Sequence, residues 1–99
     1  MRKIKVPIYN SEVIFVYNEK ELKKYIKDGD IKNCDGKFYE NNGNGVIYIG
    51  DKKSGTLIHE IIHYAIYLLQ DRGVEISYRN DECITYLAEY IYNQFIKKK

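Results

Sequence analysis

The chain has 99 residues and a formal net charge of +2, with charges of both signs interspersed along its length. A chain of this length forms one domain over residues 1–99 with one modest core, and no apolar run approaches the roughly 20 residues of a membrane span. The small net charge argues against a nucleic-acid or membrane partner, and the first six residues lack the apolar region of a secretory signal, so a cytoplasmic location is expected.

The first part of the chain predicts a β-hairpin followed by a short helix. Apolar and polar residues alternate from Lys3 to Tyr9, and a second strand is predicted from Glu12 to Tyr17 after a turn. Pro7 lacks an N–H, which favours an edge position for the first strand. Glu19 to Asp28 then predicts a charged helix with Asn18 as its N-cap.

A second hairpin is predicted in the middle of the chain. Lys37 to Glu40 and Val46 to Ile49 have the composition of strands, and the residues between them are all Asn or Gly. Such a segment forms a tight turn, because Asn and Gly tolerate the positive φ angles that hairpin turns require. The second strand of this hairpin leads directly towards the helix described next.

The stretch from Thr56 to Leu69 carries both histidines of the chain in the pattern His-Glu-x-x-His, at His59, Glu60 and His63. Residues four apart lie on the same face of a helix, so the two imidazoles point the same way and can share one metal ion. A zinc ion held by two histidines and a carboxylate keeps its fourth position open for water. A neighbouring carboxylate can then accept a proton from that water, which is the role that this spacing predicts for Glu60.

The surroundings of the motif favour metal binding over ordinary core histidines, although the latter remain an alternative. Two apolar stripes are predicted on this helix, one formed by Ile58, Ile62, Ala65, Ile66 and Leu69 and the other by Leu57, Ile61 and Leu68. A helix that is apolar on two sides is packed on two sides, and unpaired histidines there are costly unless something binds them. Ser54 or Thr56 is the expected N-cap.

A second long helix is predicted from Asp81 to about Ile96, after a helix stop at Gly73. Asn80 or Asp81 is its expected N-cap. Its apolar residues recur at helical spacing, which predicts a core stripe packed against one side of the motif helix. The lysine run from Lys97 to Lys99 is expected to be solvated and favoured by the helix dipole.

Two segments of the chain resemble a known family of enzymes. Thr56 to His63 and Asp81 to Leu87 are similar to the paired motifs of the gluzincin metallopeptidases, and more narrowly to those of minimal zincin-like proteins encoded by phages and prophages. The resemblance covers about Val46 to Phe95. It implies that Glu82 is the third zinc ligand. The chain departs from the family pattern at Thr85, where a small Ala is more common.

Other residues remain alternatives for the third ligand. Asp81 is shorter and better suited to capping a helix, and Glu89 lies two turns further along the face of Glu82. Glu82 itself can instead be a first-turn acid that the helix dipole favours. Cys83 and Cys34 are far apart and form no CxxC pair, so both are expected to be reduced thiols, with Cys83 in the core.

The resemblance also implies an oxyanion-stabilising side chain and a strand that binds substrate. Tyr86 is the first candidate for the oxyanion role, and Tyr64 and Tyr67 on the motif helix are the others. In zincins the strand before the motif helix binds extended substrate along its edge, and here that strand is Val46 to Ile49. An ordinary core strand is the alternative for this segment.

Together these features predict a small α+β, zincin-like domain in which a mostly antiparallel sheet of about four strands packs on the motif helix and a second C-terminal helix. The expected function is a zinc-dependent metallopeptidase that acts on a peptide or protein substrate, in the host cytoplasm if the protein is phage-encoded. The alternative is a zinc-stabilised, non-catalytic protein that binds and inhibits a host or defence protein. A metal-free interaction domain is the third possibility.

Overall fold

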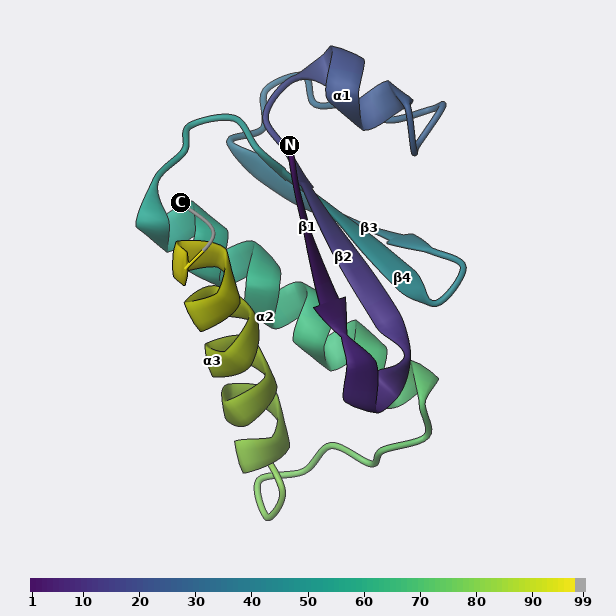
Figure 1. The fold of residues 1–99 in the computed structure, drawn as a ribbon, viewed down its shortest axis with the longest axis vertical. Coiled ribbons are helices and arrows are strands. Elements are labelled where there is room, and N and C mark those ends of the chain that lie inside the picture. Colours follow the sequence, from purple (N-terminus) through teal and green to yellow (C-terminus); the bar gives the residue numbers. More distant parts are fainter. Residues whose placement is uncertain (98–99) are drawn as a thin grey trace.

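The computed structural model describes residues 1–97, and Lys98 and Lys99 of the terminal lysine run lie outside the described residues. The elements follow one another in the order β1 (Arg2–Val6), β2 (Ser11–Val16), α1 (Glu19–Lys23), β3 (Gly36–Asn41), β4 (Asn44–Ile49), α2 (Ser54–Asp71) and α3 (Glu82–Lys97). The two long helices α2 and α3 pack against each other and against the sheet (Figure 1). The chain is therefore a small α+β domain, as the sequence predicts.

Within residues 1–97 the strands form one four-stranded sheet in the order β1-β2-β4-β3. The β1–β2 and β3–β4 pairs are antiparallel, as expected of two hairpins, whereas β2 and β4 are parallel. The parallel pair arises because the chain passes through α1 after β2 and returns on the far edge as β3. β4 then turns back between β2 and β3, so the sheet is mixed, with two antiparallel pairings and one parallel pairing.

The turn of the second hairpin is the two-residue Asn42-Gly43 segment. Both residues have positive φ angles, 52° for Asn42 and 85° for Gly43, which is the geometry of a type I′ turn and matches the twist of the strands. The turn is also held by α2, because the Gly43 N–H donates to the Tyr67 hydroxyl at 3.0 Å and the Gly43 carbonyl accepts from Arg72 at 3.2 Å. Arg72 also donates to the Tyr9 carbonyl at 2.9 Å, so it joins both hairpin turns to the end of α2.

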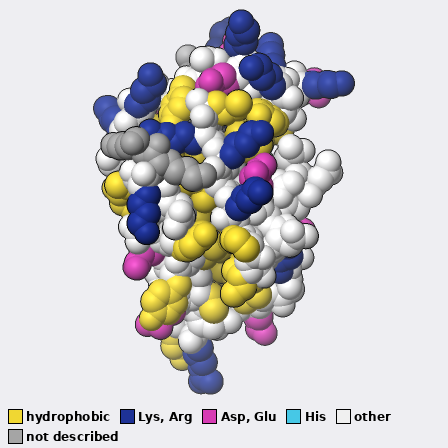
Figure 2. All heavy atoms as spheres, in the orientation of Figure 1, with side chains coloured by type: hydrophobic (Ala, Val, Ile, Leu, Met, Phe, Trp, Pro, Cys, Tyr) yellow, Lys and Arg dark blue, Asp and Glu magenta, His cyan; other side chains and the backbone are white. Residues whose placement is uncertain are grey.

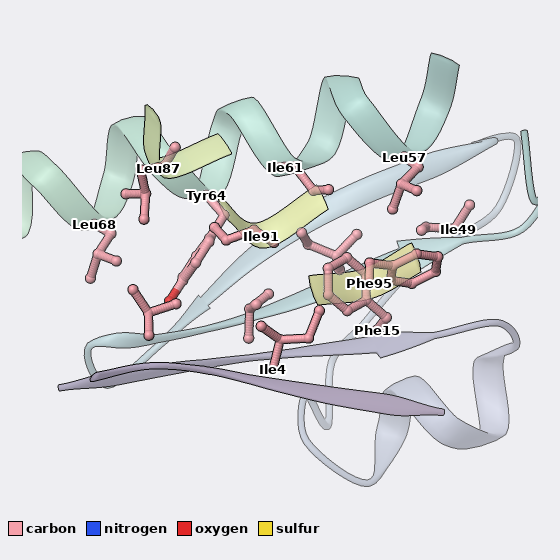
Figure 3. Packing of buried hydrophobic residues seen from close by; sticks show 14 of the residues in the cluster. Ile4, Phe15, Ile49, Leu57, Ile61, Tyr64, Leu68, Leu87, Ile91 and Phe95 are labelled. Carbon is pink, nitrogen blue, oxygen red and sulfur yellow. The ribbon is translucent and has the colours of Figure 1, made fainter. Parts of the chain in front are cut away.

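The main core lies between the sheet and the two long helices. Leu57, Ile61, Tyr64 and Leu68 project from α2 towards the strands, and Phe15 of β2 lies beside Phe95 of α3 (Figure 3). Alternate residues of β2 and β4 point to the other face, where Ile14, Val16, Val46 and Tyr48 pack around Leu22 of α1. The sheet therefore has one helix-covered face with a large core and a second face with a small one.

Two expected elements differ at their ends. β1 stops at Val6, because Pro7 begins a single 3₁₀ turn that continues to Tyr9. The predicted N-cap Asn18 is confirmed, since its side-chain oxygen accepts from the Glu21 N–H at 2.9 Å, but α1 ends at Lys23 rather than Asp28. In the described part of the chain, none of the helices has both the length and the apolar character needed to cross a membrane.

Tyr64 is a fully buried polar residue at the centre of α2. Its hydroxyl lies 2.6 Å from the Ser11 hydroxyl, which also donates to the Gly43 carbonyl at 2.8 Å. Ser11 has one hydrogen to give, so the Tyr64 hydroxyl donates to Ser11. Burial raises the pKa of Tyr64 above its usual value of 10, with smaller opposing effects from Ser11 and Arg72.

Replacing Tyr64 by Phe is expected to cost about 1–2 kcal/mol, because Ser11 then loses a buried donor. The raised pKa adds a pH dependence. The unfolded tyrosine ionises near pH 10 while the folded one does not, so this contribution to stability is present below pH 10 and declines above it. Urea denaturation at pH 7 and pH 10.5 measures both effects. The wild type should lose more stability than Tyr64→Phe between these pH values, and an equal loss would contradict the assignment.

Candidate metal and peptide-binding site

His59 and His63 lie one turn apart on α2 and point in the same direction. Their Nε2 atoms are 3.1 Å apart, and the rings meet edge to face with centroids 4.7 Å apart. This separation allows one neutral imidazole to donate to the other. Both side chains are exposed, so the pair is open to solvent and does not consist of core histidines. The shared face expected from the four-residue spacing is therefore present.

Glu60 lies beneath the histidine pair. Its side chain is 8% exposed, compared with 67% for His59, and its carboxylate lies 3.9 Å from His59 Nε2. The two residues also line one hollow together with Cys34, Asp35 and Thr56. Gly36, at the start of β3, also lines this hollow. A Cβ added at Gly36 would come within 2.5 Å of Thr56 and 3.3 Å of Glu60, so only glycine lets the strand approach this closely.

The start of α2 is held by a residue outside the predicted cap positions. The helix begins at Ser54 with Lys53 in the N-cap position, and among the described residues no side chain caps it directly, so the expected caps Ser54 and Thr56 are wrong. Asp51 holds this end instead, because it accepts from the Lys53 N–H at 3.0 Å and from the Thr56 hydroxyl at 2.8 Å. These hydrogen bonds lower the pKa of Asp51, the one from the Lys53 N–H most strongly.

The two apolar stripes predicted on α2 have different environments. Leu57, Ile61 and Leu68 are buried against the sheet, as expected. Ile58 and Ile62 of the other stripe remain 43% and 39% exposed and line a groove beside α3. Packing on two sides is therefore only partly correct, because Ala65 and Leu69 of that stripe are fully buried whereas Ile58 and Ile62 are not.

The structure brings His59, Glu60 and His63 together but leaves Glu82 apart from them. Glu82 is exposed at the first residue of α3, and across residues 1–97 no three His, Cys, Asp or Glu side chains are grouped so that they could hold a metal ion. The two rival carboxylates, Asp81 and Glu89, line the groove that Ile58 and Ile62 also line. All three acids therefore lie on α3 or just before it, whereas the two histidines lie on α2.

The tyrosines proposed for the oxyanion role lie elsewhere. Tyr86 is 66% exposed and lines a different groove, between α3 and the turn after β1. The hydroxyls of Tyr64 and Tyr67 are bound to Ser11 and Gly43 respectively. Cys83 lies in the same groove as Tyr86 and is exposed, so its expected place in the core is wrong. It is the second residue of α3, directly after Glu82.

The strand next to the motif residues is also different from the one predicted. β4, which contains Val46 to Ile49, pairs with β2 on one side and with β3 on the other. It therefore has no free edge for a substrate, and the alternative prediction of an ordinary core strand is the correct one. In the described part of the chain β3 pairs with β4 alone. β3 starts at Gly36, beside Glu60, so the open edge of the sheet lies next to the candidate site. The sequence feature that could have indicated this position of β3 is Gly36, because a glycine in a strand often marks a place where another segment or a ligand approaches closely.

The arrangement offers two convergent imidazole nitrogens, a shielded carboxylate and an adjacent open strand edge. Imidazole is a common zinc ligand, and a shielded carboxylate beside it is suited to accept a proton. No protein-family model matches the chain, and comparisons with curated proteins and with solved structures find no match.

Proposed function

We propose that the protein is a zincin-like, zinc-dependent metallopeptidase in which His59, His63 and Glu82 hold the zinc ion and Glu60 is the general base. The observation that carries this proposal is the 3.1 Å separation of the two Nε2 atoms above the buried Glu60 carboxylate. Zinc binds imidazole nitrogens at about 2.0–2.1 Å, so two histidines on one tetrahedral ion have nitrogens about 3.3–3.4 Å apart. The observed pair needs little adjustment to reach that geometry.

The third ligand requires a larger change than the histidine pair. Glu82 begins α3 directly after the irregular segment that joins the two long helices. Glu82 is not grouped with the histidines among the described residues, so its coordination of zinc requires a rearrangement at the start of α3. Glu89, further along α3, is the rival ligand, and Asp81 is the other.

The chemistry assigned to the chain's own residues follows from their burial. Bound zinc would supply Lewis acidity and lower the pKa of a coordinated water to about 7. Glu60 accepts the proton of the attacking water and later transfers it to the leaving amine, so no covalent intermediate forms. Its low exposure keeps the carboxylate in one position beside His59, because it is enclosed by Gly36 and Thr56.

An extended peptide substrate is proposed to pair with the free edge of β3. An edge strand offers backbone N–H and C=O groups to any peptide regardless of its side chains. The opposite edge of the sheet is less open, because α3 contacts β1 there: Arg2 donates to the Phe95 carbonyl at 2.7 Å and Tyr90 donates to the Lys5 carbonyl at 3.4 Å. A peptide on β3 would pass the hollow that contains Glu60.

Replacing His63 by Ala is expected to remove the bound zinc. Elemental analysis of protein purified without a metal-affinity tag should find near-stoichiometric zinc in the wild type and at least tenfold less in the variant, because one ligand cannot replace two. EDTA should also lower the melting temperature of the wild type, since binding of metal to the folded state alone stabilises it.

Gln70→Ala is the matched control, because Gln70 is an exposed residue two turns after His63 on the same helix. It should keep its zinc. Glu82→Gln and Glu89→Gln, analysed in parallel, identify the third ligand by which of them loses metal. A wild type that is well folded and contains no zinc would contradict the proposed site, and so would equal zinc in wild type and His63→Ala.

A second candidate function is a zinc-stabilised, non-catalytic protein that binds and inhibits a host or defence protein. The observation that favours it is a hydrophobic surface between α3 and the turn after β1 (Figure 2), where Ile8 is 82% exposed and Tyr86 is 66% exposed. Exposed tyrosines are enriched at protein interfaces. This candidate differs from the first in predicting that Glu60→Gln retains all biological activity.

A further inference from the structure

The groove between α2 and α3 has walls that are almost entirely apolar. Ile58 and Ile62 form the wall on α2, and Ile84 and Ala88 form the wall on α3. Its volume is about 450 Å³, which lies within the range of about 300–1,000 Å³ that is typical of ligand pockets. Two isoleucines that are each about two-fifths exposed are therefore available to cover an apolar side chain from another molecule.

The groove runs directly beside the histidine pair. Ile58 and Ile62 immediately precede His59 and His63, and successive residues of a helix are rotated by about 100°. The apolar wall and the imidazoles therefore occupy neighbouring faces of α2. A side chain that enters the groove places its own backbone over the outer surface of α2, near the two Nε2 atoms.

The polar groups at the rim of the groove are acidic. Asp81 and Glu89 both line it, and within residues 1–97 neither carboxylate forms an ion pair or a side-chain hydrogen bond. Glu82 adds a third carboxylate next to Asp81. A purely apolar ligand would leave these charges without a partner, an acidic one would be repelled, and a basic one would pair with them.

We propose that this groove selects the substrate: it binds a large aliphatic or aromatic side chain of a peptide segment that carries Lys or Arg beside that residue. The proposal rests on the peptidase function proposed above, because it places the selected residue next to the histidine pair. The apolar side chain fills the space between Ile58, Ile62 and Ile84. The neighbouring basic side chain pairs with Glu89 on α3.

The test is binding of labelled peptides to the Glu60→Gln protein, which separates recognition from hydrolysis. The probes are three fluorescein-labelled decapeptides of Gly and Ser that contain a central Leu-Arg, Ala-Arg or Leu-Glu pair, measured by fluorescence anisotropy. The Leu-Arg peptide should bind about tenfold more tightly than Ala-Arg, from the lost burial of the leucine. It should also bind several-fold more tightly than Leu-Glu, and this second difference should shrink at high salt.

Matched variants assign the binding to the groove. Ile62→Glu and Ile58→Glu should each weaken binding of the Leu-Arg peptide about tenfold, whereas Ile8→Glu, which changes a more exposed isoleucine in the other groove, should not. Glu89→Gln should reduce the preference for Leu-Arg over Leu-Glu, while Glu19→Gln on α1 should leave it unchanged. Equal affinity for Leu-Arg and Ala-Arg, or an equal effect of Ile8→Glu, would overturn the proposal.

The two proposals fail in different ways. If the wild type cleaves peptides but shows no preference for Leu-Arg, the groove proposal is wrong and the peptidase stands. If the binding preferences are as expected but the wild type cleaves none of the peptides, the groove is a recognition site and the peptidase proposal is wrong.

Discussion

Glu60→Gln is expected to reduce peptide hydrolysis by about 10²–10⁴-fold while zinc remains bound. The substitution keeps the size and shape of a side chain that is only 8% exposed, so it removes the proton acceptor without opening a cavity. Hydrolysis of fluorescein-labelled casein and of the Leu-Arg peptide measures the effect, and elemental analysis of the same samples measures the zinc.

Glu19→Gln is the control for the loss of one carboxylate. Glu19 is exposed on α1 and pairs with Lys23 at 3.0 Å, on the face of the sheet opposite α2. This variant should cleave as fast as the wild type. If Glu60→Gln cleaves within about threefold of the wild type while both contain zinc, Glu60 is not the general base.

Phe15→Ala is expected to lower the free energy of unfolding by about 3–5 kcal/mol. Phe15 is fully buried on β2, and its ring meets Phe95 edge to face with centroids 4.8 Å apart (Figure 3). Phe95 is in turn covered by the Arg2 guanidinium, 4.4 Å from its ring. Removal of the ring therefore opens a cavity where the sheet meets the end of α3. The expected fall in the free energy of unfolding is a large share of the roughly 5–15 kcal/mol that is typical of a domain.

Urea denaturation followed by circular dichroism measures this loss as a fall in the midpoint concentration. Ile8→Ala is the control, because Ile8 is 82% exposed and its truncation removes little buried area. It should change stability by less than about 0.5 kcal/mol. Comparable losses in the two variants would mean that Phe15 is not the packed centre of the main core.

Local features of this chain follow from the sequence because they depend on neighbouring residues. The four-residue spacing of His59 and His63 is enough to bring their Nε2 atoms within 3.1 Å on a helix. The Asn42-Gly43 pair specifies its own turn, because both residues accept positive φ angles. Asn18 caps α1 through a residue three positions away. Each of these arrangements involves residues that are at most four positions apart in the sequence.

Only the tertiary structure decided which segments far apart in sequence meet. β3 rather than β4 has the free edge, because β4 pairs in parallel with β2, and no local pattern specifies such a pairing. The packing of α3 sets where Glu82 lies relative to the histidines and places Tyr86 and Cys83 in a separate groove. Gly36 matters to the site because a strand from the middle of the chain passes close against Glu60. Long-range packing of this kind depends on how complete surfaces fit, and the spacing of residues along one element does not contain that information.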